Sequence, residues 1–308
     1  MEECKMAVTA KEVAALREMT GVGMMECKKA LVAAEGDMDK AIVILRERGL
    51  AAADKKSGRI ASEGTVVSIV EGNLGCVLEV NSETDFAGKS DAFQAFAKTL
   101  AQTVIAGNPA DVDSLLALKA IGTDMTVDEL LKDRILVIGE NIKIRRFTRL
   151  EGVLESYVHD GGSIGVMVKL ATSLSADKTA ECGANLAMQV AASNPLYTKR
   201  EDVPADVIEN EKDILKAQIA NDPKMANKPA QIIEKMVEGR INKYYNQHCL
   251  VEQEFIIDDS INVAKYLENV SKELGAEVKV DCFVRYEKGE GLEKKVDNFA
   301  DEVASMIK

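Results

Sequence analysis

The first fifty residues carry apolar positions at helical spacing, in three short runs separated by glycine. The first run opens with Thr9 and Glu12, which are spaced as the two halves of a capping box, and it stops before Gly21. A second run covers 24–34, and a third follows Asp37 and stops at Gly49. The pattern predicts three helices packed as a small bundle.

The second of these helices shows which side chains should face the bundle core. Met24, Cys27 and Leu31 share one face and are expected to be buried, whereas Met25 lies off that face. Two interpretations of Met25 stay open, namely partial burial or an exposed apolar residue at a helix start. The stretch 51–58 is interpreted as either a linker or an extension of the third helix.

The apolar period changes after residue 58, where two β-branched runs predict a hairpin from 66–70 and 75–80. Residues 81–86 are expected to form a loop, and Ser90 to start a helix. Five residues make the apolar face of that helix: Phe93, Phe96, Ala97, Leu100 and Val104. Thr126 and Glu129 form a second capping box, which predicts a helix up to Gly139 and then a strand at 142–147.

A similar order of elements follows about 90 residues later. Strands at 156–158 and 164–170 flank a turn at 160–162, and a helix is expected at 179–193. We interpret the two stretches as related α+β subdomains with antiparallel sheets. The alternative, a coincidence of two hairpins, stays open.

Two long helical runs, 206–220 and 230–244, are separated by a short stretch between Pro223 and Pro229. They predict an antiparallel helical hairpin. Nine residues make its two apolar stripes: Val207, Ile208, Leu215, Ile219, Ile232, Ile233, Met236, Val237 and Ile241.

The last part of the chain predicts a helix at 263–274, a strand at 278–286 and a terminal helix. The strand should return to the sheet of the second subdomain. Four residues form the apolar face of the terminal helix: Val296, Phe299, Val303 and Met306.

The expected fold class is α+β, and six segments describe the domain organisation. They are an N-terminal bundle and linker (1–57), core subdomain N (58–152), the first part of core subdomain C (153–200), the helical hairpin (201–245), the second part of subdomain C (246–288) and a C-terminal module (289–308).

Composition narrows the class of function. The 308 residues carry 39 basic and 51 acidic side chains, a formal charge of −12, which argues against a chain that mainly grips nucleic acid. Aromatic residues make up 4% with no Trp, so a base-stacking platform is not expected. The six cysteines form no C-x-x-C pair and are expected to be small core residues of a reducing, cytoplasmic protein. No apolar run is long enough to span a membrane.

Catalytic motifs are missing from the sequence. It contains no phosphate-binding glycine loop and no nucleophile elbow, and its only histidines are His159 and His248. We therefore expect no catalytic residues, no metal ligands and no cofactor, and we favour a binding protein. His159 starts a turn, where an exposed polar residue and a partner contact are equally open interpretations.

Asp85 and Phe86 follow a predicted strand and precede a predicted helix. One interpretation is a core Phe beside an Asp at a helix start. The other is an apolar wedge with an adjacent charge, directed at another protein. The residues alone leave both open.

Five segments together resemble the bacterial elongation factor Ts family, in that family's order and over nearly the whole chain. They are Thr20–Leu31, Glu79–Phe86, Gly139–Arg146, Met236–Arg240 and Phe283–Glu287. The resemblance implies a ubiquitin-associated-like N-terminal bundle, a two-subdomain core, a helical hairpin and a C-terminal helix. It also implies guanine-nucleotide exchange on the GTPase elongation factor Tu, without covalent chemistry and without direct binding of nucleotide, nucleic acid or membrane.

The resemblance also implies site residues. Thr84, Asp85, Phe86 and Ala87 match the loop that intrudes beside the magnesium and phosphate site of the GTPase, with Ala87 departing from the usual Val. Six further positions match partner contacts: Arg17, Met24, Met25, Lys28, Ile138 and His159. Some members self-associate through the hairpin, so a homodimer is an open expectation.

Two functions of other classes remain as alternatives. One is a general adaptor whose bundle presents Met24 and Met25 to peptide ligands. The other is an enzyme that uses scattered carboxylates on acyl or nucleotide substrates, against which the missing motifs argue.

Overall fold

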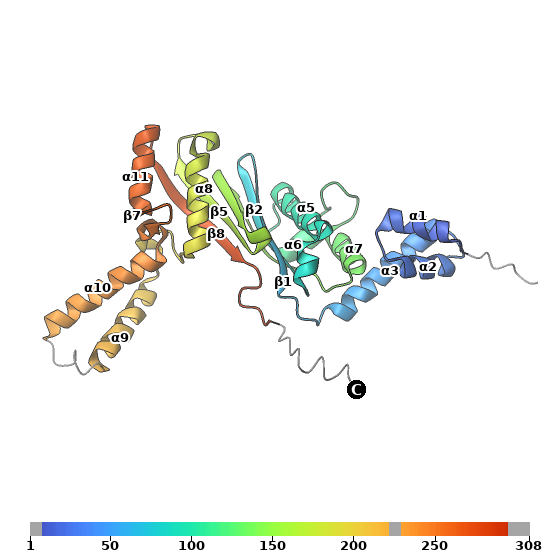
Figure 1. Cartoon of the computed structure of the whole chain (residues 1–308), viewed down its shortest axis with the longest axis horizontal. Helices are drawn as coiled ribbons and strands as arrows, with labels where there is room; N and C mark the ends of the chain where they lie inside the picture. Colours follow the sequence, from blue (N-terminus) through green and yellow to red (C-terminus); the bar gives the residue numbers. More distant parts are fainter. Residues whose placement is uncertain (1–7, 222–228, 295–308) are drawn as a thin grey trace, which may run out of the picture.

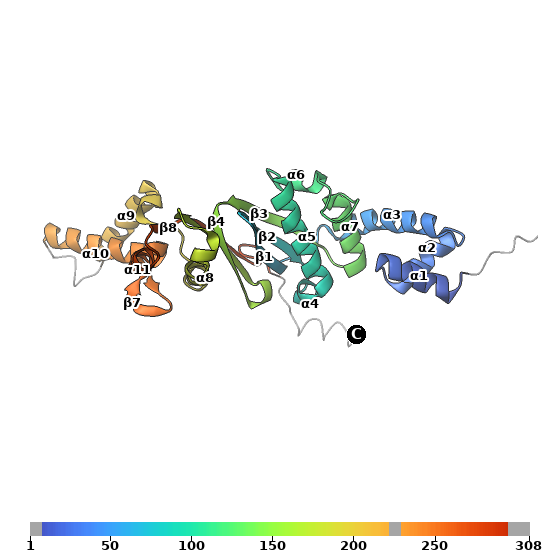
Figure 2. The same ribbon diagram turned by 90° about the horizontal axis from the view of Figure 1, so that it is seen from above.

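A computed structural model describes residues 8–221 and 229–294 of the chain. These residues form an elongated molecule, with a helical bundle at one end, a helical hairpin at the other and two sheets between them (Figure 1, Figure 2). The mixture of helices and antiparallel sheets confirms the α+β fold class.

The bundle consists of α1 (Ala10–Thr20), α2 (Met24–Ala33) and α3 (Met38–Lys56). The predicted capping box starts α1: the Glu12 N–H donates to Thr9 Oγ1 at 3.3 Å, and the Thr9 N–H donates to Glu12 Oε2 at 2.7 Å. The bundle core is made of small and branched side chains, among them Val13, Leu16, Cys27, Ala30, Leu31, Ala41 and Leu45.

Two expectations for the bundle were wrong. The third helix does not end at Gly49 but runs on to Lys56, so the helical-extension alternative is confirmed. A Cβ at Gly49 would lie 3.4 Å from the Lys132 carbonyl oxygen, so this glycine allows the close packing of α3 against α7 (Val127–Ile138). Met24 is 41% exposed and not buried, because it starts α2 at the edge of the bundle.

The first sheet has the order β1-β2-β3, with β1 at Glu63–Glu71, β2 at Leu74–Ser82 and β3 at Lys143–Glu151. The predicted hairpin and closing strand are thus confirmed. Helix α5 (Asp91–Gly107) packs on this sheet, and all five residues of its predicted apolar face are buried. A short helix, α6 (Val112–Ala117), was not predicted.

The second sheet has the order β4-β5-β8, with β4 at Val153–His159, β5 at Ile164–Thr172 and β8 at Val278–Glu287. The strand predicted to return to this sheet does so. Helix α8 (Ala176–Ser193) packs on β4 and β5, and α11 (Val263–Leu274) packs beside β8.

The two sheets share one plan, which supports the predicted relationship between the subdomains. Each has a hairpin followed by a helix and a later third strand that pairs antiparallel with the second. Each also has a register shift between its second and third strands, at Glu79/Val80 and at Lys169/Leu170. The sheets pack on each other through Val66, Val77, Leu154 and Met167.

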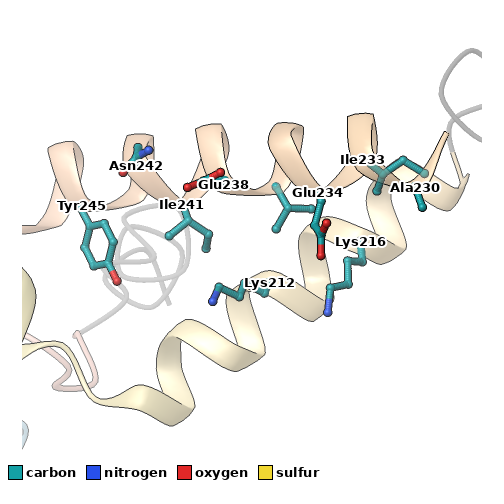
Figure 3. A pocket seen from close by; sticks show the side chains of 10 residues that line it. Lys212, Lys216, Ala230, Ile233, Glu234, Glu238, Ile241, Asn242 and Tyr245 are labelled. Carbon is teal, nitrogen blue, oxygen red and sulfur yellow. The ribbon is translucent and has the colours of Figure 1, made fainter. Parts of the chain in front are cut away.

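The hairpin at the far end consists of α9 (Ala205–Asn221) and α10 (Ala230–His248). Its core contains Leu215, Ile219, Val237 and Ile241, four of the nine predicted stripe residues. Ile232 is instead exposed, because α10 has only one neighbouring helix to cover it. A groove of about 720 Å³ runs along the two helices between Tyr245 and Ala230 (Figure 3).

The remaining elements include a two-stranded hairpin, β6 (Glu254–Phe255) and β7 (Asp258–Asn262), which was not predicted. Four cysteines are buried as expected and Cys282 is partly buried, while Cys4 lies outside the described residues. The predicted terminal helix at 296–306 also lies outside them. Across 8–221 and 229–294, no helix is long and apolar enough to cross a membrane.

Candidate functional site

Residues 85–89 form a short helix, α4 (Asp85–Lys89), where a loop was expected. Thr84 is its N-cap, because the side-chain hydroxyl accepts a hydrogen bond from the Ala87 N–H at 3.3 Å. Phe86 is 84% exposed, so the interpretation as a core Phe was wrong. The most exposed aromatic ring in the described chain therefore stands on a helix of one turn.

The face of α4 opposite Phe86 packs directly on the first sheet. A Cβ built at Gly88 would lie 2.6 Å from the Gly64 carbonyl oxygen, so the backbone of α4 touches the backbone of β1. Gln94 Nε2 donates to the Gly88 carbonyl at 2.6 Å, and Ser90 Oγ donates to the Ala87 carbonyl at 2.7 Å. Ala87 is buried beneath the helix. Phe86 thus projects from a helix whose opposite face is held.

A second set of contacts holds the start of α4. The Glu140 carboxylate accepts from the Thr84 N–H at 3.0 Å and from the Thr84 hydroxyl at 2.6 Å. The neighbouring Glu83 accepts from the Asn141 N–H at 2.6 Å and forms an ion pair with Arg59. The segment before α4 and the segment after α7 are therefore joined by two carboxylates, one from each segment.

The charges on α4 are paired with each other. Lys89 Nζ lies 2.9 Å from Asp85 Oδ2, one turn along the helix. The hydrogen bond from Lys89 lowers the pKa of the Asp85 carboxyl from its ordinary value. Both groups are at the surface, so this pair contributes little to stability and can exchange partners at low cost.

His159 ends β4 and is exposed, with its Nδ1 3.1 Å from the Tyr157 hydroxyl oxygen. The turn after it (Asp160–Gly162) and α4 both contact β1. The pKa of Lys89 is raised mainly by Asp85, with Asp160 adding to the effect. The structure therefore brings the β4–β5 turn and α4 to the same end of the core.

The other predicted contact residues are distributed differently. Ile138 ends α7, two residues before Glu140, and is partly buried against the core of the first sheet. Met25 is 65% exposed on α2. Arg17 and Lys28 are exposed as well, on α1 and α2. These bundle residues lie at one end of the molecule, beyond α7 and away from α4 (Figure 2).

Two features in separate parts of the described chain escaped the sequence analysis (Figure 2). Glu140 lies in the Gly139–Arg146 segment and had no predicted role, although a polar residue directly after a helix-ending glycine is placed for a loop contact. Ile256 and Ile257 are exposed at the tip of the β6–β7 hairpin. An adjacent Ile pair favours a strand interior, so no local pattern indicated this exposed turn.

Comparison with known proteins identifies the chain's relatives. Residues 83–290 match the family model described as elongation factor TS. The chain is 47% identical over 307 residues to elongation factor Ts of Syntrophotalea carbinolica, covering 98% of this chain and 100% of that protein. It is 47% identical over 304 residues to elongation factor Ts of Clostridium perfringens, covering 97% and 99% of the two chains. It is 46% identical over 306 residues to that of Clostridium botulinum, covering 97% and 98%. The chain therefore belongs to the elongation factor Ts family of translation elongation factors.

Proposed function

We propose that this chain is a guanine-nucleotide exchange factor for elongation factor Tu, and that α4 carries the exchange activity. The observation that carries the proposal is Phe86, an 84% exposed aromatic side chain on a helix anchored at both ends. Family membership supports the partner and the class of activity.

The mechanism requires selective binding and no covalent step. Bound GDP is held largely by Mg²⁺ and by backbone donors around the phosphates. A factor that binds the empty GTPase better than the filled one must weaken nucleotide binding by the same factor. Each tenfold change corresponds to about 1.4 kcal/mol, so burial of one aromatic ring in the partner could supply a substantial part of the effect.

The proposed roles follow the positions of the four loop residues. Phe86 is the wedge that disturbs the geometry around Mg²⁺ and phosphate. Asp85 can leave its surface pair with Lys89 and engage a partner side chain. Thr84 caps the helix, and Ala87 packs beneath it with a smaller side chain than the usual Val.

The remaining predicted contacts are proposed as secondary partner surfaces. His159 lies at the same end of the core as α4, and Ile138 lies two residues before Glu140. Arg17, Met24, Met25 and Lys28 would form a separate contact through the bundle.

The exposed methionines also suit the adaptor alternative, in which the bundle binds peptides and the core is a scaffold. That function predicts peptide binding without any change in nucleotide release. The rate of nucleotide release therefore distinguishes the adaptor function from the exchange function.

Self-association through α9 and α10 is a further proposal. The groove along the hairpin and the exposed Ile214 and Ile232 offer apolar surface for a second copy. Sedimentation equilibrium of the purified chain would measure a concentration-dependent mass if the proposal is right and a constant monomer mass if it is wrong.

Release of a fluorescent GDP analogue from elongation factor Tu tests the proposed function. The GTPase loaded with the N-methylanthraniloyl derivative of GDP is mixed with the intact chain and excess unlabelled GDP in a stopped-flow instrument. The proposal expects release to accelerate with factor concentration up to a plateau. Unchanged release at all concentrations would exclude exchange activity and leave the adaptor alternative.

A further inference from the structure

We propose that Glu140 is a positioning residue for exchange, acting through Thr84 to set the direction of Phe86. This inference rests on the proposed exchange function and adds a residue that does not itself need to touch the partner. Its basis is the pair of hydrogen bonds that the Glu140 carboxylate accepts from Thr84, at 3.0 Å from the N–H and 2.6 Å from the hydroxyl.

The hydroxyl hydrogen bond fixes more than the position of Thr84. A hydroxyl has one hydrogen to donate and lone pairs to accept with. Because the Thr84 hydrogen is directed at Glu140, its lone pairs remain for the Ala87 N–H, which lies 3.3 Å away. Glu140 therefore orients the group that caps α4, and Phe86 is the second residue of that helix.

A second hydrogen bond between a carboxylate and a backbone N–H joins the same two segments, with the carboxylate now on the segment before α4. Glu83 accepts from the Asn141 N–H at 2.6 Å, while the Asn141 side chain donates to the Arg59 carbonyl at 2.7 Å. Two segments 56 to 58 residues apart in sequence are thus joined twice by carboxylate–amide hydrogen bonds. Charge-assisted bonds of this kind are stronger than neutral ones and define direction as well as distance.

Helix α4 needs such an anchor because of its length. It has five residues, and an isolated helix of one turn is not stable in water. Gly88 and Gln94 hold its end against the sheet, and the Glu140 contacts hold its start. If the start is released, Phe86 can swing, and a loosely held side chain must be ordered again on binding.

The first test compares Glu140→Ala with Glu151→Ala as a matched control. Glu151 is also a surface carboxylate. It is the last residue of β3 and accepts a hydrogen bond from Asn73 at the opposite end of the sheet from α4. We expect Glu140→Ala to lower the plateau rate of GDP release about tenfold, with a smaller change in the concentration that gives half the plateau. Glu151→Ala should keep the rate of the unchanged chain.

A double-mutant cycle tests whether Glu140 acts through Thr84. Thr84→Val removes the hydroxyl, so both single variants lose the hydrogen bond between the two side chains. Their combination should therefore lower the rate by less than the product of the two single effects. Thr84→Ser keeps a hydroxyl at this position and should keep most of the rate that Thr84→Val loses. Effects that multiply independently would show that Glu140 does not act through Thr84.

A spectroscopic test needs no partner and no activity. The chain has no Trp, so Phe86→Trp would place a single tryptophan at the tip of α4. Adding Glu140→Ala should lower the fluorescence anisotropy of Trp at this position, and adding Glu151→Ala should not. Equal anisotropy in all three proteins would overturn the positioning role.

These outcomes separate the positioning role from the exchange function. If the intact chain accelerates GDP release but Glu140→Ala matches it at the plateau, the positioning role is wrong and exchange stands. If the intact chain does not accelerate release, exchange is wrong, and unchanged anisotropy would then reject the Glu140 anchor as well.

Discussion

The Gly289 N–H donates a hydrogen bond to Glu79 Oε1 at 2.8 Å, across 210 positions of sequence. Glu79 lies on β2 of the first sheet, and its side chain is completely buried. Arg145 and Arg146 both bind the same carboxylate, at 2.9 and 2.7 Å. A single buried charge therefore connects β2, β3 and the segment that follows β8.

The contacts around Gly289 make this connection specific. Its φ angle is +71°, and a Cβ there would lie 2.2 Å from the Ser62 carbonyl oxygen, so only glycine fits. Lys288 pairs with Glu63 at 2.6 Å, and Arg146 stacks over the Tyr286 ring at 4.2 Å. The end of β8 is thereby fixed to the first sheet.

Loss of the Glu79 carboxylate should strongly destabilise the chain. Glu79→Ala removes the carboxylate that Arg145 and Arg146 share. Their remaining acceptors lie on exposed residues of the segment 287–290. Breaking a buried ion pair typically costs about 3–5 kcal/mol. Urea denaturation followed by circular dichroism measures the cost. Glu151→Ala serves as the control, because that carboxylate is exposed. Its urea midpoint should shift as little as is usual for a substitution at the surface. A midpoint for Glu79→Ala equal to that of the control would show that the network contributes nothing.

Glu79 should also make the fold sensitive to acid. Burial tends to raise the pKa of this carboxyl, but hydrogen bonds from Gly289, Asn81 and the two arginines hold the pKa below its ordinary value of 4.5. A lowered folded pKa contributes stability that is present above 4.5 and is lost as pH falls through the folded pKa.

The measurement is the free energy of unfolding between neutral pH and about pH 3. Glu79→Gln should weaken the fold at neutral pH and flatten this part of the pH profile, since Gln does not titrate. An equally steep profile in Glu79→Gln would assign the acid sensitivity to other carboxylates.

Gly88→Ala should displace α4 from β1. The new methyl group would lie 2.6 Å from the Gly64 carbonyl oxygen, so the helix must shift, at a typical cost of about 1–3 kcal/mol. We expect lower stability together with slower GDP release. Gly239→Ala on α10 has no atom within 4 Å of its new Cβ and should be slightly stabilising. A rate of GDP release for Gly88→Ala equal to that of the unchanged chain would show that the packing of α4 on β1 does not matter for exchange.

Local patterns predicted much of the fold. Both capping boxes start helices as expected, at Thr9 and at Thr126, because the spacing of hydroxyl and carboxylate is set within one turn. The face of α5 from Phe93 to Val104 is buried because its period matches a helix lying on a sheet. The resemblance in ordered motifs gave the family, which the comparisons confirm.

Features set by distant contacts were harder to predict. Gly49 ends no helix because α7 packs against it, and the sequence near residue 49 does not contain that information. The exposure of Phe86 depends on the packing of α4 on the sheet, which buries Ala87 and leaves the Phe86 ring outside. The role of Glu140 depends on Thr84, 56 positions earlier, and no local pattern joins the two. The domain boundaries and the partner contacts remain predictions.

The central claim is that the exposed ring of Phe86 drives nucleotide release. Its most direct test is the plateau rate of fluorescent GDP release from elongation factor Tu with Phe86→Ala, beside Leu196→Ala as a control for loss of an exposed apolar side chain. We predict that Phe86→Ala lowers the plateau rate by tenfold or more, about 1.4 kcal/mol, with an unchanged melting temperature, and that Leu196→Ala does neither. An unchanged plateau rate for a folded Phe86→Ala protein would contradict the account.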